Sequence, residues 1–193
     1  MRTIVALLLA FAAATVYAQT NVRVRGTINA VNGDVLSVKS RDGRDIQLQL
    51  APDAQVVVPK KVSAAEFKPG SYVGVTSVKD AQGRLVAKRV HALGPQVPQM
   101  HGAWDSIPNS FMTNANIESM AKVSGGNELT LKYKDGEQKI LVTPETEYYN
   151  FGPGTREDLK PGAMIFAGAK VEGDGKFMAP RIVVGKDGVN PPQ

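Results

Sequence analysis

The feature that most constrains the fold is an internal repeat in which the second copy follows the first at an offset of 92 residues. The segment Glu66–Gly70 (EFKPG) returns as Asp158–Gly162 (DLKPG). The segment Gly83–Ala87 (GRLVA) returns at the same offset as Gly175–Ala179 (GKFMA). A register that is kept across several segments indicates one structural unit written twice. We therefore expect two copies of the same small fold.

Each copy is predicted to form five short strands with a helical turn between the third and the fourth. In the first copy, Asp42-Gly43 is a hairpin turn signal, because this pair readily adopts positive φ angles. The alternation of Ile46, Leu48 and Leu50 with polar residues has the period of a half-buried strand. Ser63–Glu66 has the pattern of a capping box that opens a short helical turn.

Three strands, a helical turn and two strands is the order of an OB-fold, a small Greek-key barrel. An SH3-like barrel is the alternative, since it also closes five strands around a small core. Pro180 lies inside the last strand of the second copy and predicts an edge or a bulge there. The expected fold is all-β, with two tandem five-stranded OB-like barrels that follow a signal peptide. The predicted ranges are a signal peptide at 1–18, a first barrel at 19–93, a Pro/Gly-rich linker at 94–114, a second barrel at 115–185 and a tail at 186–193.

The N-terminus has the three parts of a secretory signal peptide. Met1-Arg2 is a short basic segment, Ile4–Ala14 is an uninterrupted apolar run, and Val16-Tyr17-Ala18 provides small residues before a cleavage point at Gln19. The apolar run is shorter than the roughly 20 residues that a membrane-spanning helix needs. We expect a periplasmic or secreted protein that is cleaved after Ala18 and is not inserted in the membrane.

The composition excludes several kinds of chemistry. The chain has no Cys and only two His, which removes thiolate nucleophiles, disulfides and Cys-based metal sites. No P-loop and no GxSxG nucleophile elbow is present. The 23 Lys and Arg residues are interspersed with 18 Asp and Glu residues, and such mixing is not typical of a nucleic-acid-binding face. We expect a non-enzymatic binding or accessory protein with no required cofactor, whose partner is a cell-envelope protein or a small ligand.

Several motifs resemble those of an exported bacterial family of tandem OB-like β-barrel domains without an established activity. The motifs are Gly26–Val31, Gly33–Leu36, Asp42-Gly43, Phe67–Gly70, Gly83–Ala87, and, in the second copy, Met112–Ala115 with Leu131–Glu137. The resemblance covers nearly the whole chain after the signal peptide and implies the fold and the compartment. Relatives in that family often carry the label of a metal transport permease, which this chain cannot be, because its sequence contains no spanning helices.

The segment between the copies contains the candidate metal site. Met100, His101 and Met112 offer thioether and imidazole ligands of the kind that suits Cu(I) or Ag(I). His91 is the reserve fourth ligand, and the indole of Trp104 is placed to shield the ion. This set of residues is similar to the ligand set of the periplasmic copper chaperones of silver/copper efflux systems. The resemblance implies that the chain handles a soft metal ion.

A packing role is the alternative for the same residues. Met commonly fills irregular gaps in a core, and a lone Trp is usually a packing anchor. In this interpretation Trp104 plugs the groove between the two barrels, while Met112 and Met120 pack in the second core.

Aromatic residues of the second copy provide an alternative ligand site. Neighbouring side chains alternate along a strand, so Tyr148, Tyr149 and Phe151 cannot all be buried on one side. We expect at least one of these rings to face outward or into the groove between the barrels. That arrangement would suit an oligosaccharide- or protein-binding module of the cell envelope.

Overall fold

The computed structural model describes residues 21–172 and 176–191, and the expected signal peptide at 1–18 lies outside these ranges. The fold is all-β, as predicted, and two 3-10 turns, η1 (Ala64–Glu66) and η2 (Arg156–Asp158), accompany the strands. No helix within the described ranges has the length and the apolar character needed to cross a membrane. The strands are β1 (Asn21–Asn32), β2 (Val35–Ser40), β3 (Asp45–Lys61), β4 (Tyr72–Lys79), β5 (Leu85–Ala92), β6 (Met100–Trp104), β7 (Ser110–Val123), β8 (Gly126–Tyr133), β9 (Gly136–Val142), β10 (Glu147–Pro153), β11 (Met164–Val171) and β12 (Phe177–Val184).

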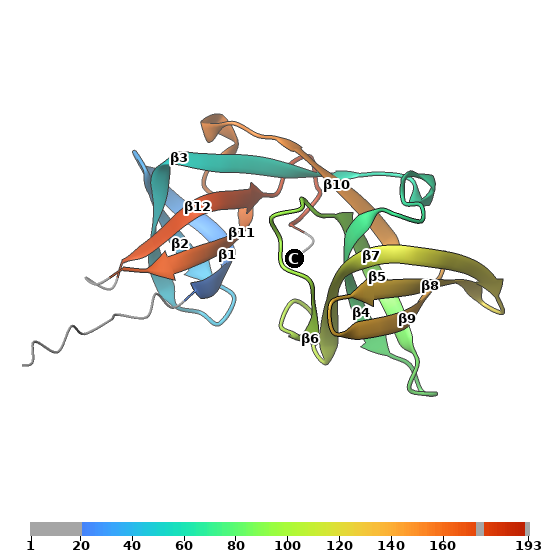
Figure 1. Cartoon of the computed structure of the whole chain (residues 1–193). Helices are drawn as coiled ribbons and strands as arrows, with labels where there is room; N and C mark the ends of the chain where they lie inside the picture. The colour runs from blue at the N-terminus through green and yellow to red at the C-terminus, as the bar shows by residue number, and fades with distance from the viewer. Residues whose placement is uncertain (1–20, 173–175, 192–193) are drawn as a thin grey trace, which may run out of the picture.

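The strand pairings close two rings of five strands each (Figure 1). The first ring runs β1–β2–β3–β12–β11 and returns to β1. The second ring runs β7–β8–β9–β5–β4 and returns to β7. In each ring one pairing is parallel, β3 with β12 and β9 with β5, and the others are antiparallel. Each ring encloses its own apolar cluster, one around Leu36 and Leu48 and the other around Val75 and Leu131.

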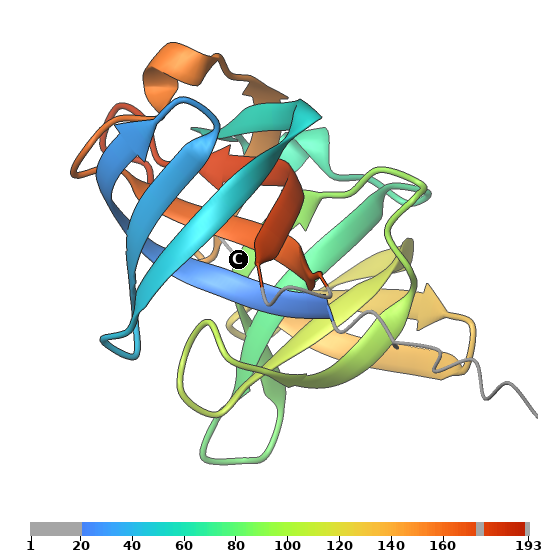
Figure 2. The same cartoon turned by 90° about the vertical axis from the view of Figure 1, so that its left-hand side faces the viewer.

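The rings do not coincide with the predicted ranges 19–93 and 115–185, because each ring contains strands of both copies. The first ring takes β1, β2 and β3 from the first copy and β11 and β12 from the second. The second ring takes β7, β8 and β9 from the second copy and β4 and β5 from the first. The cause is the length of β3, which does not turn back after its first half but carries the chain across to the other ring. Figure 2 shows the first ring in front of the second from the side.

The crossing between the rings has a local two-fold symmetry. The end of β3 pairs antiparallel with β10, and the pairing is centred on Phe151. The Val62 N–H donates to the Tyr148 carbonyl at 2.9 Å, and the Gly154 N–H donates to the Val56 carbonyl at the same distance, 2.9 Å. The two bonds are equivalent, because Gly154 follows Val62 and Tyr148 follows Val56 at the repeat offset of 92 residues. The two connecting segments therefore exchange strands between the rings in the same way (Figure 1).

The segment expected to be a linker, 94–114, is partly a β-hairpin. Met100–Trp104 forms β6, which pairs with the start of β7. That strand begins at Ser110, earlier than the predicted start of the second copy. The predicted helical turn after Ser63 is confirmed as η1, and the Ser63 hydroxyl caps it by accepting from the Ala65 N–H at 3.3 Å, without the reciprocal Glu66 bond of a capping box. The β3–β12 register shifts between Ala179 and Arg181, so the pairing is irregular at Pro180, as predicted.

Candidate functional site

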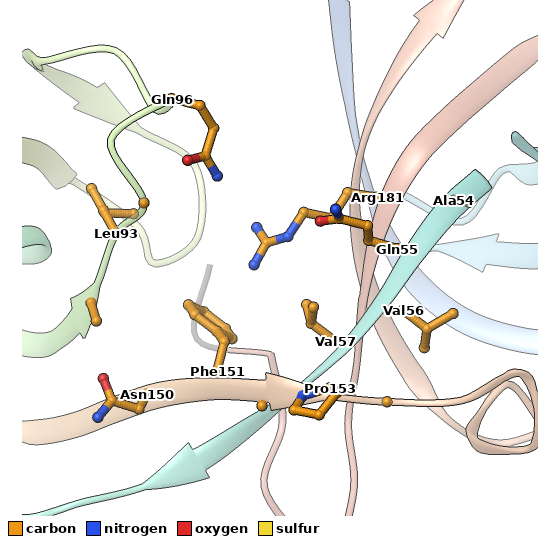
Figure 3. A pocket seen from close by; sticks show the side chains of 14 residues that line it. Ala54, Gln55, Val56, Val57, Leu93, Gln96, Asn150, Phe151, Pro153 and Arg181 are labelled. Carbon is orange, nitrogen blue, oxygen red and sulfur yellow. The ribbon is translucent and has the colours of Figure 1, made fainter.

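A cleft of about 700 Å³ lies between the two rings at the strand crossing (Figure 3). Its walls come from β3, β10, β12 and the segment that follows β5. Phe151 and Val57 contribute apolar surface, and Arg181 projects from β12 into the space between them. The lining residues are Ala54, Gln55, Val56, Val57, Ala92, Leu93, Gly94, Gln96, Asn150, Phe151, Gly152, Pro153, Gly154 and Arg181.

Arg181 is the charged group of this cleft. Its guanidinium lies over the Phe151 ring at 5.4 Å from the centroid. No carboxylate within the described ranges lies at ion-pair distance from it. Partial burial lowers the pKa of Arg181 from its ordinary value, but an arginine remains charged in proteins. The cleft therefore contains a desolvated positive charge without a counter-ion.

The repeat explains why this arginine lacks a partner. Arg181 is the equivalent of Arg89 at the repeat offset, and Gln55 is the equivalent of Glu147. In one half of the molecule Arg89 pairs in register with Glu147, and their side chains form an ion pair at 3.6 Å. In the other half Arg181 pairs in register with Gln55, which is neutral. The two-fold arrangement thus retains both arginines but only one of the two carboxylates.

His91 lies beside the cleft and is fully buried. Its register partner on β4 is Gly74, where a Cβ would lie 2.5 Å from the imidazole Nε2, so the glycine leaves room for the ring. The imidazole meets Phe151 edge-on, with centroids 5.7 Å apart. Burial lowers the pKa of His91, the charges of Arg181 and Arg89 act in the same direction, and together they bring it to about 3. His91 is therefore neutral at physiological pH and supports the aromatic wall.

Neutral amides surround the charged group. Gln55 and Gln96 line the cleft beside Arg181 (Figure 3). The Asn150 amide donates to the Glu66 carboxylate at the outer end. One guanidinium, several amides and an apolar wall form a surface that can hold an anion attached to a small apolar body.

The strand register separates the predicted metal ligands. In the β6–β7 pair, Gly102 lies opposite Met112 and Met100 lies opposite Asn114, so both methionines project from one face. His101 lies on the opposite face, where its Nδ1 is 2.9 Å from the Thr113 hydroxyl. The structure therefore does not bring His101 to Met100 and Met112.

His91 shares the methionine face but lies far along it. The register row runs from His91 through Gly74 and Asn114 to Met100, which is three strand spacings or about 14 Å. In the described part of the chain, no group of three or more His, Asp or Glu side chains is arranged to hold a metal ion.

The structure does not place Met112 and Met120 in the second core, where the packing alternative expects them. Met112 is buried, at 2% exposed, but it projects from the face of β7 opposite to Ala115 and Ile117 and does not belong to the apolar cluster of the second ring. Met120 is 40% exposed. Trp104 packs against the first ring, with the Arg23 guanidinium 4.0 Å above its ring.

The three candidate aromatic ligands have different environments. Tyr148 packs against Phe67 with ring centroids 5.6 Å apart, and Tyr149 is buried. Burial and the neighbouring Glu147 raise the pKa of Tyr149 to about 12. Of the three, Phe151 lines the cleft.

Arg181 was not predicted as a site residue from the sequence. The signal was present in the repeat, because aligning the copies places Gln55 where the other copy has Glu147.

Comparisons with known proteins give no relative for this chain. No family model matches it, no curated protein is significantly similar, and no solved structure matches its fold significantly.

Proposed function

We propose that this protein binds a small organic anion in the cleft between the rings, with Arg181 as the charged anchor. The observation that carries the proposal is the broken symmetry of the arginine pair. Arg89 has Glu147 as its partner, while Arg181 faces Gln55 and the open cleft. A partly desolvated charge without a partner destabilises a fold, so its retention is explained if an external anion supplies the missing charge.

The lining favours a monocarboxylate with a flat apolar body. Guanidinium and carboxylate form paired hydrogen bonds in a fixed plane. The Phe151 ring, which lies under the guanidinium, and the Val57 and Leu93 side chains offer apolar contact to the body of the ligand. We propose binding rather than catalysis, because the lining combines one guanidinium with amides and apolar groups and includes no carboxylate, imidazole or hydroxyl side chain.

The proposal also includes two predictions from the sequence, the OB-type barrels and the location outside the cytoplasm. The order of strands in each ring, with the third and fifth strands parallel, supports assignment of both rings as OB-type barrels assembled by strand exchange. The N-terminal pattern supports a role outside the cytoplasm, where the cleft would meet ligands of the cell envelope or the surroundings.

Calorimetric titration of the chain with benzoate tests the proposal, and benzamide serves as the neutral probe of the same shape. We expect benzoate to bind and benzamide not to bind. Arg181→Gln should weaken benzoate binding at least about tenfold, since a hydrogen-bonded charge pair contributes about that much. Equal binding of the two probes, or unchanged benzoate binding by Arg181→Gln, would refute the proposal.

A second variant, Gln55→Glu, gives Arg181 the same kind of partner that Arg89 has in Glu147. We expect this variant to lose benzoate binding and to unfold at a higher temperature than the parent. The control is Gln47→Glu, which makes the same change at an exposed position of the same strand. A Gln55→Glu variant that binds benzoate like the Gln47→Glu control would exclude Arg181 as the anchor.

A further inference from the structure

Four arginines gather at one end of the first ring, on a surface separate from the cleft. Arg23 and Arg25 are two residues apart on β1 and project from the same face of the strand. Arg41 and Arg44 flank the turn between β2 and β3, and the Arg41 N–H donates to the Arg25 carbonyl at 2.9 Å. A hollow of about 370 Å³ lies among the four side chains. We call this group the four-arginine site.

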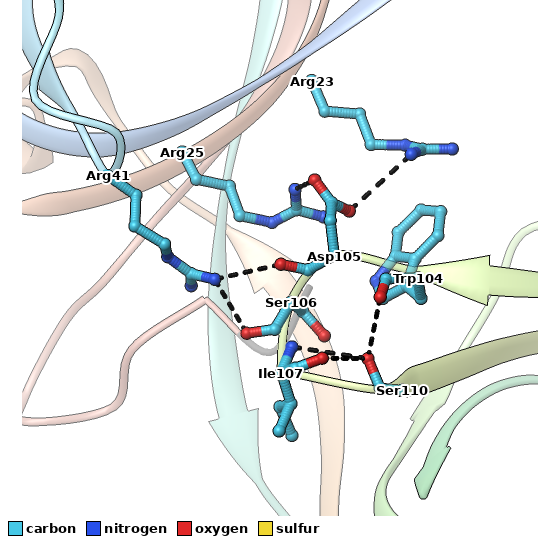
Figure 4. A network of polar contacts seen from close by, with 8 residues as sticks. All are labelled: Arg23, Arg25, Arg41, Trp104, Asp105, Ser106, Ile107 and Ser110. Atoms are coloured by element: carbon cyan, nitrogen blue, oxygen red, sulfur yellow. Dashed lines mark hydrogen bonds and ion pairs between the residues drawn. The ribbon is translucent and has the colours of Figure 1, made fainter.

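A loop of the second ring closes one side of the four-arginine site (Figure 4). The Asp105 carboxylate accepts a hydrogen bond from Arg25 and lies 3.7 Å from the Arg23 guanidinium. Arg41 donates to the main-chain carbonyls of Asp105 and Ser106 at 3.2 and 2.8 Å. The loop thus places one carboxylate against two guanidinium groups and two carbonyl oxygens against a third.

The positive charge of the site exceeds the negative charge. Four guanidinium groups face two carboxylates, Asp105 and Asp42, and Asp42 is paired with Arg44 at 2.8 Å. Arg41 has hydrogen bonds to carbonyl oxygens and no carboxylate partner within the described ranges. Arg25 is 8% exposed, and its Nε and Nη2 have no hydrogen-bond partner among the described atoms. Two positive charges therefore remain without counter-ions.

We propose that the four-arginine site binds a phosphate group in its dianionic form. A phosphate dianion carries the two negative charges that the site lacks, and its oxygens can accept from several guanidinium groups at once. Arg23, Arg41 and Arg44 are exposed and offer their donors to the hollow. Arg25 lies beneath them, held by Asp105, and adds its charge from below. The site is independent of the cleft proposed for the organic anion.

The single Trp of the chain provides the readout. Trp104 has the Arg23 guanidinium 4.0 Å above its ring and the Arg25 guanidinium at 5.4 Å. A phosphate that binds to Arg23 changes the field at the indole, so its fluorescence should change with saturation. Titration with inorganic phosphate, at an ionic strength held constant with sodium chloride, measures the dissociation constant.

The variant that tests the site is Arg41→Gln with Arg44→Gln, because both side chains are exposed. We expect it to bind phosphate at least about tenfold more weakly than the parent, with the same cooperative thermal transition. The matched control is Lys132→Gln with Lys139→Gln, which removes two charges from exposed side chains of the second ring. This control should bind phosphate like the parent.

Two further arms locate the ligand and identify its source. Arg181→Gln should retain phosphate binding, because Arg181 belongs to the cleft. Glucose 6-phosphate that binds more tightly than inorganic phosphate would assign the site to phosphate esters, and equal binding would assign it to free phosphate. The proposal is overturned if phosphate gives no saturable response, if the double arginine variant binds like the parent, or if Arg181→Gln abolishes binding.

Discussion

Acidification from pH 7 to pH 5 should destabilise this fold through His91, a residue that is fully buried beside the cleft. Burial and two neighbouring arginines lower the pKa of its imidazole to about 3 in the folded state, whereas the unfolded value is about 6.5. Below the unfolded value the unfolded chain binds a proton that the folded chain does not bind. The stability is therefore complete above the unfolded pKa and decreases as the pH falls towards the folded pKa. Between pH 7 and pH 5 this linkage lowers the free energy of unfolding by about 2 kcal/mol.

Urea unfolding at pH 7, 6 and 5 measures this loss. His91→Gln should remove most of the difference between pH 7 and pH 5, whatever its effect on stability at pH 7. His101→Gln is the control. Burial and Lys79 lower the pKa of this half-buried ring too, but His91 is still present in this variant. Most of the pH dependence should therefore remain. Carboxylates add little in this range, because their ordinary pKa values lie near 4. A free energy of unfolding that does not change between pH 7 and pH 5, or a pH dependence that persists in His91→Gln, would refute the reasoning.

Three other predictions follow from the fold. Fragments 19–95 and 96–193 should not fold as monomers when separate, because in either fragment each ring lacks two or three of its strands. Their mixture should regain the circular dichroism of the parent as a 1:1 complex, and a cooperative thermal transition of either fragment as a monomer would contradict the strand pairing. Gly74→Ala should lower the free energy of unfolding by about 2 kcal/mol in urea melts, because its Cβ would lie 2.5 Å from the His91 Nε2; a variant as stable as the parent would contradict that contact. Titration with Ag(I) should leave Trp104 fluorescence nearly unchanged, because His101 and Met112 face opposite sides of the β6–β7 pair; a tight response that His101→Ala abolishes would show that the ligands converge.

The sequence was sufficient to predict the local elements and the repeat. Alternation identified the strand at Ile46, Leu48 and Leu50, and capping chemistry identified the turn after Ser63. Ring membership could not be predicted in this way. The two copies offer equivalent strands, so the hydrophobic pattern of β3 is satisfied equally well by β5 and by β12. The choice depends on whether the chain turns back or continues after β3, which is a property of backbone geometry.

The candidate sites show the same limit. Adjacent residues in a strand face opposite sides, so Met100 and His101 could share an ion only in a turn, and the structure has a strand there. His91 is buried because its register partner, Gly74, leaves room for the imidazole. No local sequence pattern shows that these two residues lie opposite each other. The sequence does contain the information that singles out Arg181, because aligning the two copies shows Gln55 at the position where the other copy has Glu147. That comparison becomes meaningful once the pairing of Arg89 with Glu147 is known.

The exchange of strands between the rings also sets the order in which a growing chain can finish folding. The second ring has all its strands once Val142 has been synthesised, since it consists of β4, β5, β7, β8 and β9. The first ring, whose strands β1 to β3 are made first, waits for β12, which ends at Val184. Until β11 and β12 have been made, β1 and the first part of β3 each have one unpaired edge, and such edges are prone to aggregation or to capture by chaperones. A chain that ends before Phe177 lacks β12 and leaves this ring open at the strands that were made first.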